Sequence, residues 1–218
     1  MIALPSPLLI VTDRLQAQRP LEDVVRDVVA AGVRWIWFRD RDMEPTERRR
    51  LALRLANIVH GAGGRLSIGG DVELAAETGT GAVHARDLAE IAHARRMLGP
   101  QALIGLSAHC VADVANANNA GADYVTLSPI HETASKPGYG PALGNAAITQ
   151  AARIGIPVVA LGGIAADNAA AAMKAGAAGI AVMGGVMRAT SPVDTIKTLL
   201  AECGVSCHCT CSELGRGA

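Results

Sequence analysis

The sequence predicts one compact (β/α)8 barrel, and three observations support this fold class. The chain has 218 residues, a length within the range of a single barrel of this kind. Half of the residues are hydrophobic, so a sizeable core can form. Short apolar runs alternate with longer segments of helical period along the chain, and this alternation is typical of a parallel sheet covered by helices.

Eight apolar runs are the expected strands, and each ends in polar or glycine residues. In order they are PLLIVTD (7–13), AAGVRWIWFRD (30–40), RLSIGG (65–70), ETGTGAVHARD (77–87), ALIGLSAH (102–109), NAGADYVTLSP (119–129), IPVVALGG (156–163) and KAGAAGIAVMGG (174–185). In four of them a glycine precedes the apolar run, which is the usual signal that a helix has stopped before a strand. The segments between strands include two clear helical patterns, over 45–63 and 88–99.

Eight strand–helix units favour a closed barrel. An open, doubly wound sheet is the alternative, but no G-x-G-x-x-G follows the first strand to support it. We expect the barrel to occupy residues 1–202 and residues 203–218 to form a disordered, cysteine-rich tail. Only 2% of the residues are aromatic, so we expect an aliphatic, alanine-rich core.

The cysteine-rich tail holds Cys203, Cys207, Cys209 and Cys211, with His208 among them. Thiols and an imidazole this close together could bind zinc or another soft metal. The spacing lacks the paired C-x2-C steps of a structural zinc site, so we favour a loose, redox-sensitive tail.

The charge balance argues for small-molecule partners. Lys and Arg together number 20, as do Asp and Glu, so the formal net charge is zero. A nucleic-acid or membrane surface would need a stronger basic or apolar footprint, and we expect neither partner. No basic leader precedes an apolar segment, and no uncharged run reaches the roughly 18 residues of a membrane span. We therefore expect a cytoplasmic protein.

Paired glycines mark the last two strand ends, Gly162–Gly163 and Gly184–Gly185. In a barrel of this class the residues after each strand meet on the face that carries the active site. Glycine lets main-chain N–H groups approach an anion closely, so we predict a phosphate site here. The alternative is that these glycines only make tight turns.

Two arginines follow the second strand. Arg39 and Arg41 are alternate residues, so their side chains can share a direction and face one anion. Arg39 could equally well form an ion pair with Asp13 across the mouth of the barrel.

The sixth strand is followed by SPIHETASKPGYGPALG (128–144), a loop rich in proline and glycine. Long ordered loops are uncommon unless they serve a site. Thr133, Ser135 and Lys136 offer hydroxyls and a cation to a phosphate or diphosphate. His131 is the one loop group that exchanges protons near neutral pH, so it is our candidate acid/base, although a loop histidine is more often a surface residue.

Segments across almost the whole chain resemble the thiamin phosphate synthase and TenI family. They are LLIVTDR (8–14), FRDR (38–41), DVELAAETGTGAVH (71–84), IGLSAH (104–109), GADYVTLSPIHETASKPG (121–138) and VVALGGI (158–164). The synthase joins an aminopyrimidine diphosphate to a hydroxyethylthiazole phosphate and releases diphosphate with the help of Mg²⁺. The resemblance implies that the diphosphate is held by Arg39, Ser107, Thr133, Ser135 and Lys136. It also implies that the thiazole phosphate is held by Gly162, Gly163, Gly184 and Gly185.

Three positions depart from the synthase pattern. Gly69–Gly70 stand in place of an Asn-Asp pair whose Asp is a metal ligand, Ala89 replaces a second metal carboxylate, and Trp37 replaces a glutamine near the pyrimidine. Without both carboxylates the ion that neutralises the leaving diphosphate is lost. We therefore expect no metal, unless Asp71 or Asp87 restores the Mg²⁺ site of a synthase.

The TenI branch resembles the chain better, because its members also lack the metal carboxylates. Those enzymes isomerise a thiazole carboxylate phosphate by a proton shift that needs no metal. Their catalytic histidine aligns with Pro129, and His131 stands two residues on, which in an extended strand is the same side.

We therefore predict a thiazole tautomerase, an isomerase without a cofactor. A Mg²⁺-dependent thiamin phosphate synthase, a transferase, is the first alternative. A non-catalytic regulatory protein that binds thiazole phosphate is the second. An exposed aliphatic helix face could also support a homo-oligomer.

Overall fold

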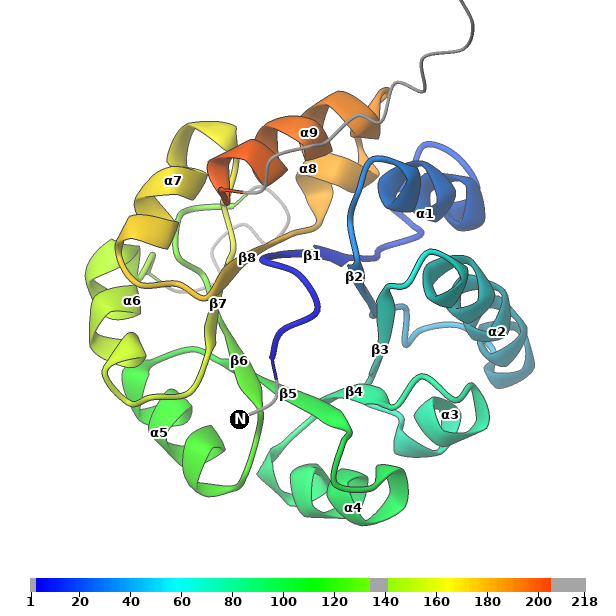
Figure 1. Cartoon of the computed structure of the whole chain (residues 1–218), viewed down its shortest axis with the longest axis horizontal. Helices are drawn as coiled ribbons and strands as arrows, with labels where there is room; N and C mark the ends of the chain where they lie inside the picture. Colours follow the sequence, from blue (N-terminus) through cyan, green and yellow to red (C-terminus); the bar gives the residue numbers. More distant parts are fainter. Residues whose placement is uncertain (1–2, 134–140, 205–218) are drawn as a thin grey trace, which may run out of the picture.

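The predicted (β/α)8 barrel is confirmed. The structure, a computed structural model, describes residues 3–133 and 141–204. In this part of the chain eight parallel strands close into one barrel in sequence order, β1 pairing with both β2 and β8. Helices surround the barrel on the outside (Figure 1).

The strands are short and evenly spaced along the chain. They are β1 (Leu8–Val11), β2 (Trp35–Phe38), β3 (Arg65–Gly69), β4 (Ala82–Ala85), β5 (Leu103–Ala108), β6 (Tyr124–Leu127), β7 (Val158–Leu161) and β8 (Gly179–Val182). The helices are α1 (Leu21–Ala30), α2 (Pro45–Gly61), α3 (Val72–Glu77), α4 (Leu88–Leu98), α5 (Val111–Asn119), α6 (Gly144–Ala152), α7 (Ala166–Lys174), α8 (Gly184–Met187) and α9 (Pro192–Glu202).

Alternating side chains divide the core into two layers. In β1, Leu8 and Ile10 point outward into the large cluster between barrel and helices, whereas Leu9 and Val11 point inward. The outer layer is almost entirely aliphatic and alanine-rich, as the composition predicts. All four β1 residues are buried, because a parallel strand is covered on both faces.

The barrel interior differs from the prediction of an aliphatic core. Trp35, Trp37 and Tyr124 lie inside it, with the Trp35 and Tyr124 rings packed edge to face at 4.7 Å. Gly105 on β5 makes this packing possible, since a Cβ atom there would collide with the Tyr124 ring. Composition missed this feature because it gives no information on where a few aromatic residues lie.

The glycines that precede the apolar runs stop helices as expected. Gly32, Gly121 and Gly176 have φ values of 107°, 84° and 104°, a region that residues with a side chain rarely adopt. Each follows a helix and directs the chain into the next strand.

Within the described residues, no helix combines the length and apolar character needed to cross a bilayer. The last helix, α9, ends at Glu202, and Cys203 is half-buried against the N-terminal segment. Cys207, His208, Cys209 and Cys211 lie outside the described residues, so the tail stays a prediction.

Candidate active site

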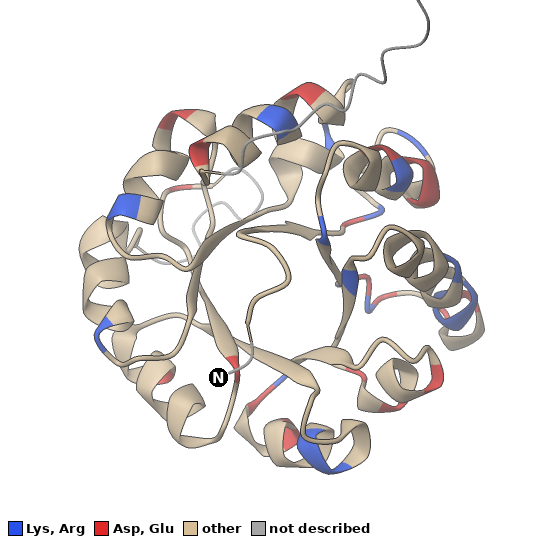
Figure 2. Ribbon diagram, in the orientation of Figure 1, with Lys and Arg blue, Asp and Glu red and all other residues tan. Residues whose placement is uncertain are grey.

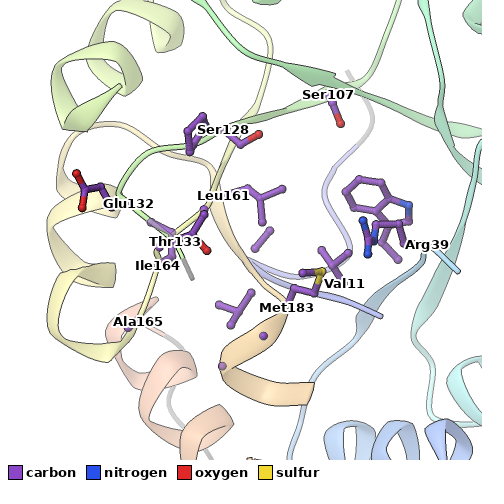
Figure 3. A pocket seen from close by; sticks show the side chains of 18 of the residues that line it. Val11, Arg39, Ser107, Ser128, Glu132, Thr133, Leu161, Ile164, Ala165 and Met183 are labelled. Carbon is purple, nitrogen blue, oxygen red and sulfur yellow. The ribbon is translucent and has the colours of Figure 1, made fainter. Parts of the chain in front are cut away.

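A cavity of about 370 Å³ opens at the carboxyl ends of the strands. Its walls come from residues that follow β1, β2 and β5 to β8. Figure 3 shows Arg39 and Ser107 on one side of it and Thr133, Ile164 and Ala165 on the other. Val11, Leu161 and Met183 lie between these sides and give the middle of the cavity an apolar lining.

Both predicted glycine pairs line this cavity. The carbonyl of Gly162 accepts from His131 N at 3.0 Å, and the carbonyl of Gly163 accepts from Asn168 Nδ2 at 2.9 Å. In the described part of the chain, none of the four glycine N–H groups donates to another protein group. These main-chain donors can therefore hold an anion, which is consistent with the predicted phosphate site.

Arg188 adds a positive charge to the part of the cavity formed by Gly162–Gly163 and Gly184–Gly185, the glycine end. It lines the cavity, and its guanidinium lies so close over Gly184 that a Cβ atom there would collide with it. Its Nη1 donates to Gln16 Oε1, and Gln16 Nε2 donates to Asp13 Oδ2 at 2.7 Å. A guanidinium beside free main-chain amides is a suitable partner for a phosphate oxygen.

Arg39 forms the ion pair with Asp13 that the sequence offered as one of two arrangements. Its Nη2 donates to Asp13 Oδ2 at 2.8 Å, and the side chain also lines the cavity. Its Nε is buried without a hydrogen-bond partner. Unsatisfied buried donors are rare in proteins, so this N–H is free to bind a ligand acceptor.

Ser107 is held by a buried polar chain beneath the cavity. His84 Nε2 lies 3.0 Å from Ser107 Oγ, and His84 Nδ1 lies 3.1 Å from Tyr124 Oη. Trp37 stacks on the imidazole with ring centroids 3.8 Å apart. Burial, and secondly the charge of Arg41, lowers the pKa of His84 to about 3, so the ring is neutral at ordinary pH. A neutral imidazole donates with one nitrogen and accepts with the other, which fixes the Ser107 hydroxyl.

The loop after β6 brings different residues to the cavity from those predicted. Thr133 lines it, but His131 does not, and His131 Nε2 is buried without a hydrogen-bond partner. Glu132 of this loop also lines the cavity, as does His109, which follows β5. Ser135 and Lys136 lie outside the described residues, so their predicted contacts stay untested.

Arg41 is absent from the described cavity lining, so the two arginines after β2 do not share it. Instead Arg41 lies beside Gly70, at the end of β3, next to Arg86. Burial lowers the pKa of Arg41; Glu90 opposes this effect, while the positive charges of Arg48, Arg86 and Arg39 add to it.

Known proteins resemble this chain over nearly its full length. A family model described as thiamine monophosphate synthase matches residues 8–186. The thiamine-phosphate synthase of Marinobacter nauticus is 35% identical over 184 residues, covering 84% of this chain and 82% of that protein. The chain belongs to the thiamine monophosphate synthase family. The thiamine-phosphate synthase of Azorhizobium caulinodans is likewise 35% identical, over 195 residues, which are 88% of this chain and 92% of that protein.

A solved structure supports the same fold for this family member. Thiamine phosphate pyrophosphorylase from Pyrococcus furiosus superposes with a TM-score of 0.79 at 24% identity, covering 89% of this chain and 94% of the other. At this level of identity the likeness concerns the fold. The comparisons show the thiamine monophosphate synthase family, and they do not single out its TenI branch.

The described carboxylates do not fit the Mg²⁺ ion that the synthase family implies. Asp71 is the N-cap of α3, accepting from Leu74 N at 2.9 Å, and it forms an ion pair with Arg48 at 2.5 Å. Asp87 is the exposed N-cap of α4 and accepts from Glu90 N at 3.0 Å. No group of three or more His, Cys, Asp or Glu side chains in residues 3–133 and 141–204 could hold a metal ion.

The sequence analysis did not identify Arg188, and its acid/base candidate, His131, is not among the described residues that line the cavity. Arg188 follows Gly184 by one helical turn. The i, i+4 spacing therefore could have predicted that the Arg188 side chain lies near the glycine end. The direction of the His131 side chain could not be predicted, because the direction of a loop side chain depends on tertiary packing.

Proposed function

We propose that this protein is a thiamine-phosphate synthase, a transferase that joins an aminopyrimidine diphosphate to a hydroxyethylthiazole phosphate and releases diphosphate. Its membership of the thiamin-biosynthetic family rests on the comparisons, and the relatives named above carry this synthase name. The finer assignment replaces the tautomerase that the sequence favoured.

One observation carries the proposal: a single cavity is lined by two sets of donors suited to anions, which are linked through Gln16 and Asp13. Free glycine amides and Arg188 form one set, and Arg39, with its unpartnered Nε, belongs to the other. A joining reaction between two phosphorylated molecules needs two such sets and an apolar space for two rings between them. A tautomerase, which handles one phosphorylated molecule, needs only the glycine end.

The position of His131 also weighs against the predicted tautomerase. An acid/base must come within hydrogen-bond reach of the proton that it transfers. His131 is not among the described residues that line the cavity. In the proposed reaction the groups facing the cavity bind and orient the two substrates, and Ser107, fixed by His84, gives one oriented hydroxyl to the diphosphate-bearing one.

The test is turnover of the purified chain with both substrates, followed by chromatographic detection of thiamin phosphate. We expect Arg39→Gln to lower kcat/KM about tenfold to a hundredfold, since a hydrogen bond to a charged group contributes about 1.5–3 kcal/mol. Arg39→Lys keeps the charge and should retain more activity. The matched control is Arg96→Gln on the exposed side of α4, which should leave kcat/KM unchanged.

Two outcomes would overturn the assignment. One is conversion of thiazole carboxylate phosphate alone, without formation of thiamin phosphate from the two substrates. The other is tight binding of thiazole phosphate with no conversion of either substrate, which is the behaviour of a regulatory protein.

A further inference from the structure

We propose that Arg41 and Arg86 form a cationic diphosphate site that works without a protein-held metal ion. The inference rests on the proposed synthase function and deepens it, by naming the groups of this chain that bind the leaving diphosphate. The region that a metal-binding carboxylate would occupy, beside Gly70, is filled by these two side chains.

The geometry brings the two arginines together on the face that carries the cavity. Arg41 follows β2, Gly70 follows β3 and Arg86 follows β4, and these strands are neighbours in the barrel. Figure 2 shows basic and acidic residues on the loops on this side of the barrel. A Cβ atom on Gly70 would lie 2.5 Å from Arg86 Cγ and 2.9 Å from Arg41 Cζ. Both side chains thus converge over Gly70, whose φ of 58° suits glycine.

Three guanidinium groups lie around Gly70, those of Arg41, Arg48 and Arg86, and two of them have a direct ion-pair partner. Arg48 is paired with Asp71, and Arg86 is paired with the buried Glu90 at 2.8 Å. Arg41 forms no ion pair or hydrogen bond with any of the described residues. Arg41 is thus attracted by Glu90 without direct contact and repelled by the other arginines, and a bound anion would offset that repulsion.

The chemistry favours a diphosphate over a smaller anion. Glu90 fixes Arg86 through its main-chain N at 2.6 Å and its Nε at 2.9 Å, while the side chain stays 61% exposed. Planar guanidinium groups match phosphate oxygens in paired hydrogen bonds. Arg41 and Arg86 together offer two cations, which suits the several negative charges of a diphosphate better than the smaller charge of a monophosphate.

Fixed cations at this position would assist the departure of the leaving group. During the joining reaction the bond from the pyrimidine methylene carbon to the diphosphate oxygen breaks, and that oxygen keeps the electron pair. The thiazole ring nitrogen supplies the pair for the new carbon–nitrogen bond. Charge builds up on the diphosphate, and preorganised guanidinium groups stabilise it as it forms.

The experiment measures binding of inorganic diphosphate by isothermal titration calorimetry in excess EDTA. Wild type should bind without Mg²⁺, and Arg41→Gln and Arg86→Gln should each raise Kd about tenfold, the change expected for loss of one charge-assisted hydrogen bond. Arg86→Lys should keep most of the affinity, and Arg96→Gln should behave as wild type. Thermal unfolding of each variant shows that it is folded.

Binding that requires Mg²⁺, or variants that bind as tightly as wild type, would overturn the inference. A triple variant provides a second test. Gly70→Asp and Ala89→Asp restore the two metal-binding carboxylates, and Arg86→Gly removes one cation, so diphosphate binding should then depend on Mg²⁺. Asp tolerates a positive φ better than most residues. The two proposals fail separately: binding in EDTA without formation of thiamin phosphate refutes the synthase alone, and turnover with Mg²⁺-dependent diphosphate binding refutes the arginine site alone.

Discussion

The face that carries the active-site cavity has two sides built from different chemical groups. The glycine end, after β7 and β8, offers main-chain N–H groups. The carbonyl groups of Gly162 and Gly163 in this end accept hydrogen bonds from His131 and Asn168, which fixes the backbone. The arginine side, after β2 to β4, offers side chains that pair with carboxylates such as Asp13, Asp71 and Glu90. A main-chain site depends on backbone conformation, whereas a side-chain site depends on how charges are matched.

This difference explains where the chain departs from the synthase pattern. All three departures lie on the arginine side, and two of them, Gly69–Gly70 and Trp37, are coupled sterically. The missing Cβ of Gly69 leaves room for Trp37 Nε1, which lies 2.9 Å from that position, and the missing Cβ of Gly70 leaves room for Arg86. Side-chain sites can be exchanged in such sets, while a main-chain site at positive φ has few alternatives to glycine.

The largest loss of stability is expected from a substitution at Gly163, in the glycine end. Its φ is 64°, and a Cβ atom would lie 2.5 Å from the main-chain oxygen of Glu132. We expect Gly163→Ala to lower the free energy of unfolding by about 2–3 kcal/mol, because both strain and collision involve the backbone. For a chain of this size that corresponds to a fall in Tm of about 4–12 °C.

Gly184→Ala is the matched control, because the three atoms nearest to its added Cβ all belong to the flexible end of Arg188. It should cost less than about 1 kcal/mol of stability while weakening phosphate binding. Equal losses of Tm in the two variants would contradict the view that the glycine end depends on backbone conformation.

A second prediction concerns the buried chain that supports the arginine side. The pKa of His84 is about 3 in the folded protein, against an ordinary value of 6.5. Below pH 6.5 the unfolded chain takes up a proton that the folded chain does not, so stability falls as the pH falls. The slope from this group is about 1.4 kcal/mol per pH unit until the folded pKa is reached.

The check is chemical denaturation between pH 7 and pH 5. His84→Gln removes the titrating group, so the loss of stability over this range should shrink by about 2 kcal/mol. His93→Gln, at an exposed helix position, is the control and should keep the wild-type profile. An unchanged profile in His84→Gln would mean that the folded imidazole accepts a proton, and that Ser107 is not held by a neutral ring.

Sequence reasoning succeeded where structure depends on local rules. The eight strands, the helix-stopping glycines and the glycine pairs at the cavity follow from hydrophobic period and from the conformational freedom of glycine. It failed where packing between distant segments decides. Gly105 leaves room for Tyr124 in the barrel interior, and Gly69 leaves room for Trp37. His131 packs against Gly162 and Gly163 and is not among the described residues that line the cavity.

The Mg²⁺ question shows the same limit. The resemblance to the synthase family showed that two metal-binding carboxylates are missing. It also made Asp71 and Asp87 the candidates to replace them as Mg²⁺ ligands. Both are instead helix N-caps, a role in which the carboxylate accepts a main-chain hydrogen bond. The S/T/D/N signal at the start of a helix was present in the sequence for both residues, so this role could have been weighed beforehand.

The smallest expected effect comes from Asp87→Asn. Asparagine caps a helix about as well as aspartate, so the free energy of unfolding should change by less than about 0.5 kcal/mol. Because Asp87 is exposed and binds only Glu90 N among the described residues, kcat/KM measured at several Mg²⁺ concentrations should stay within about twofold of wild type. Loss of a metal ligand would give a much larger fall, which high Mg²⁺ partly restores. Such a result would mean that Asp87 binds Mg²⁺ on the arginine side, and that this side uses a metal ion as the synthase pattern does.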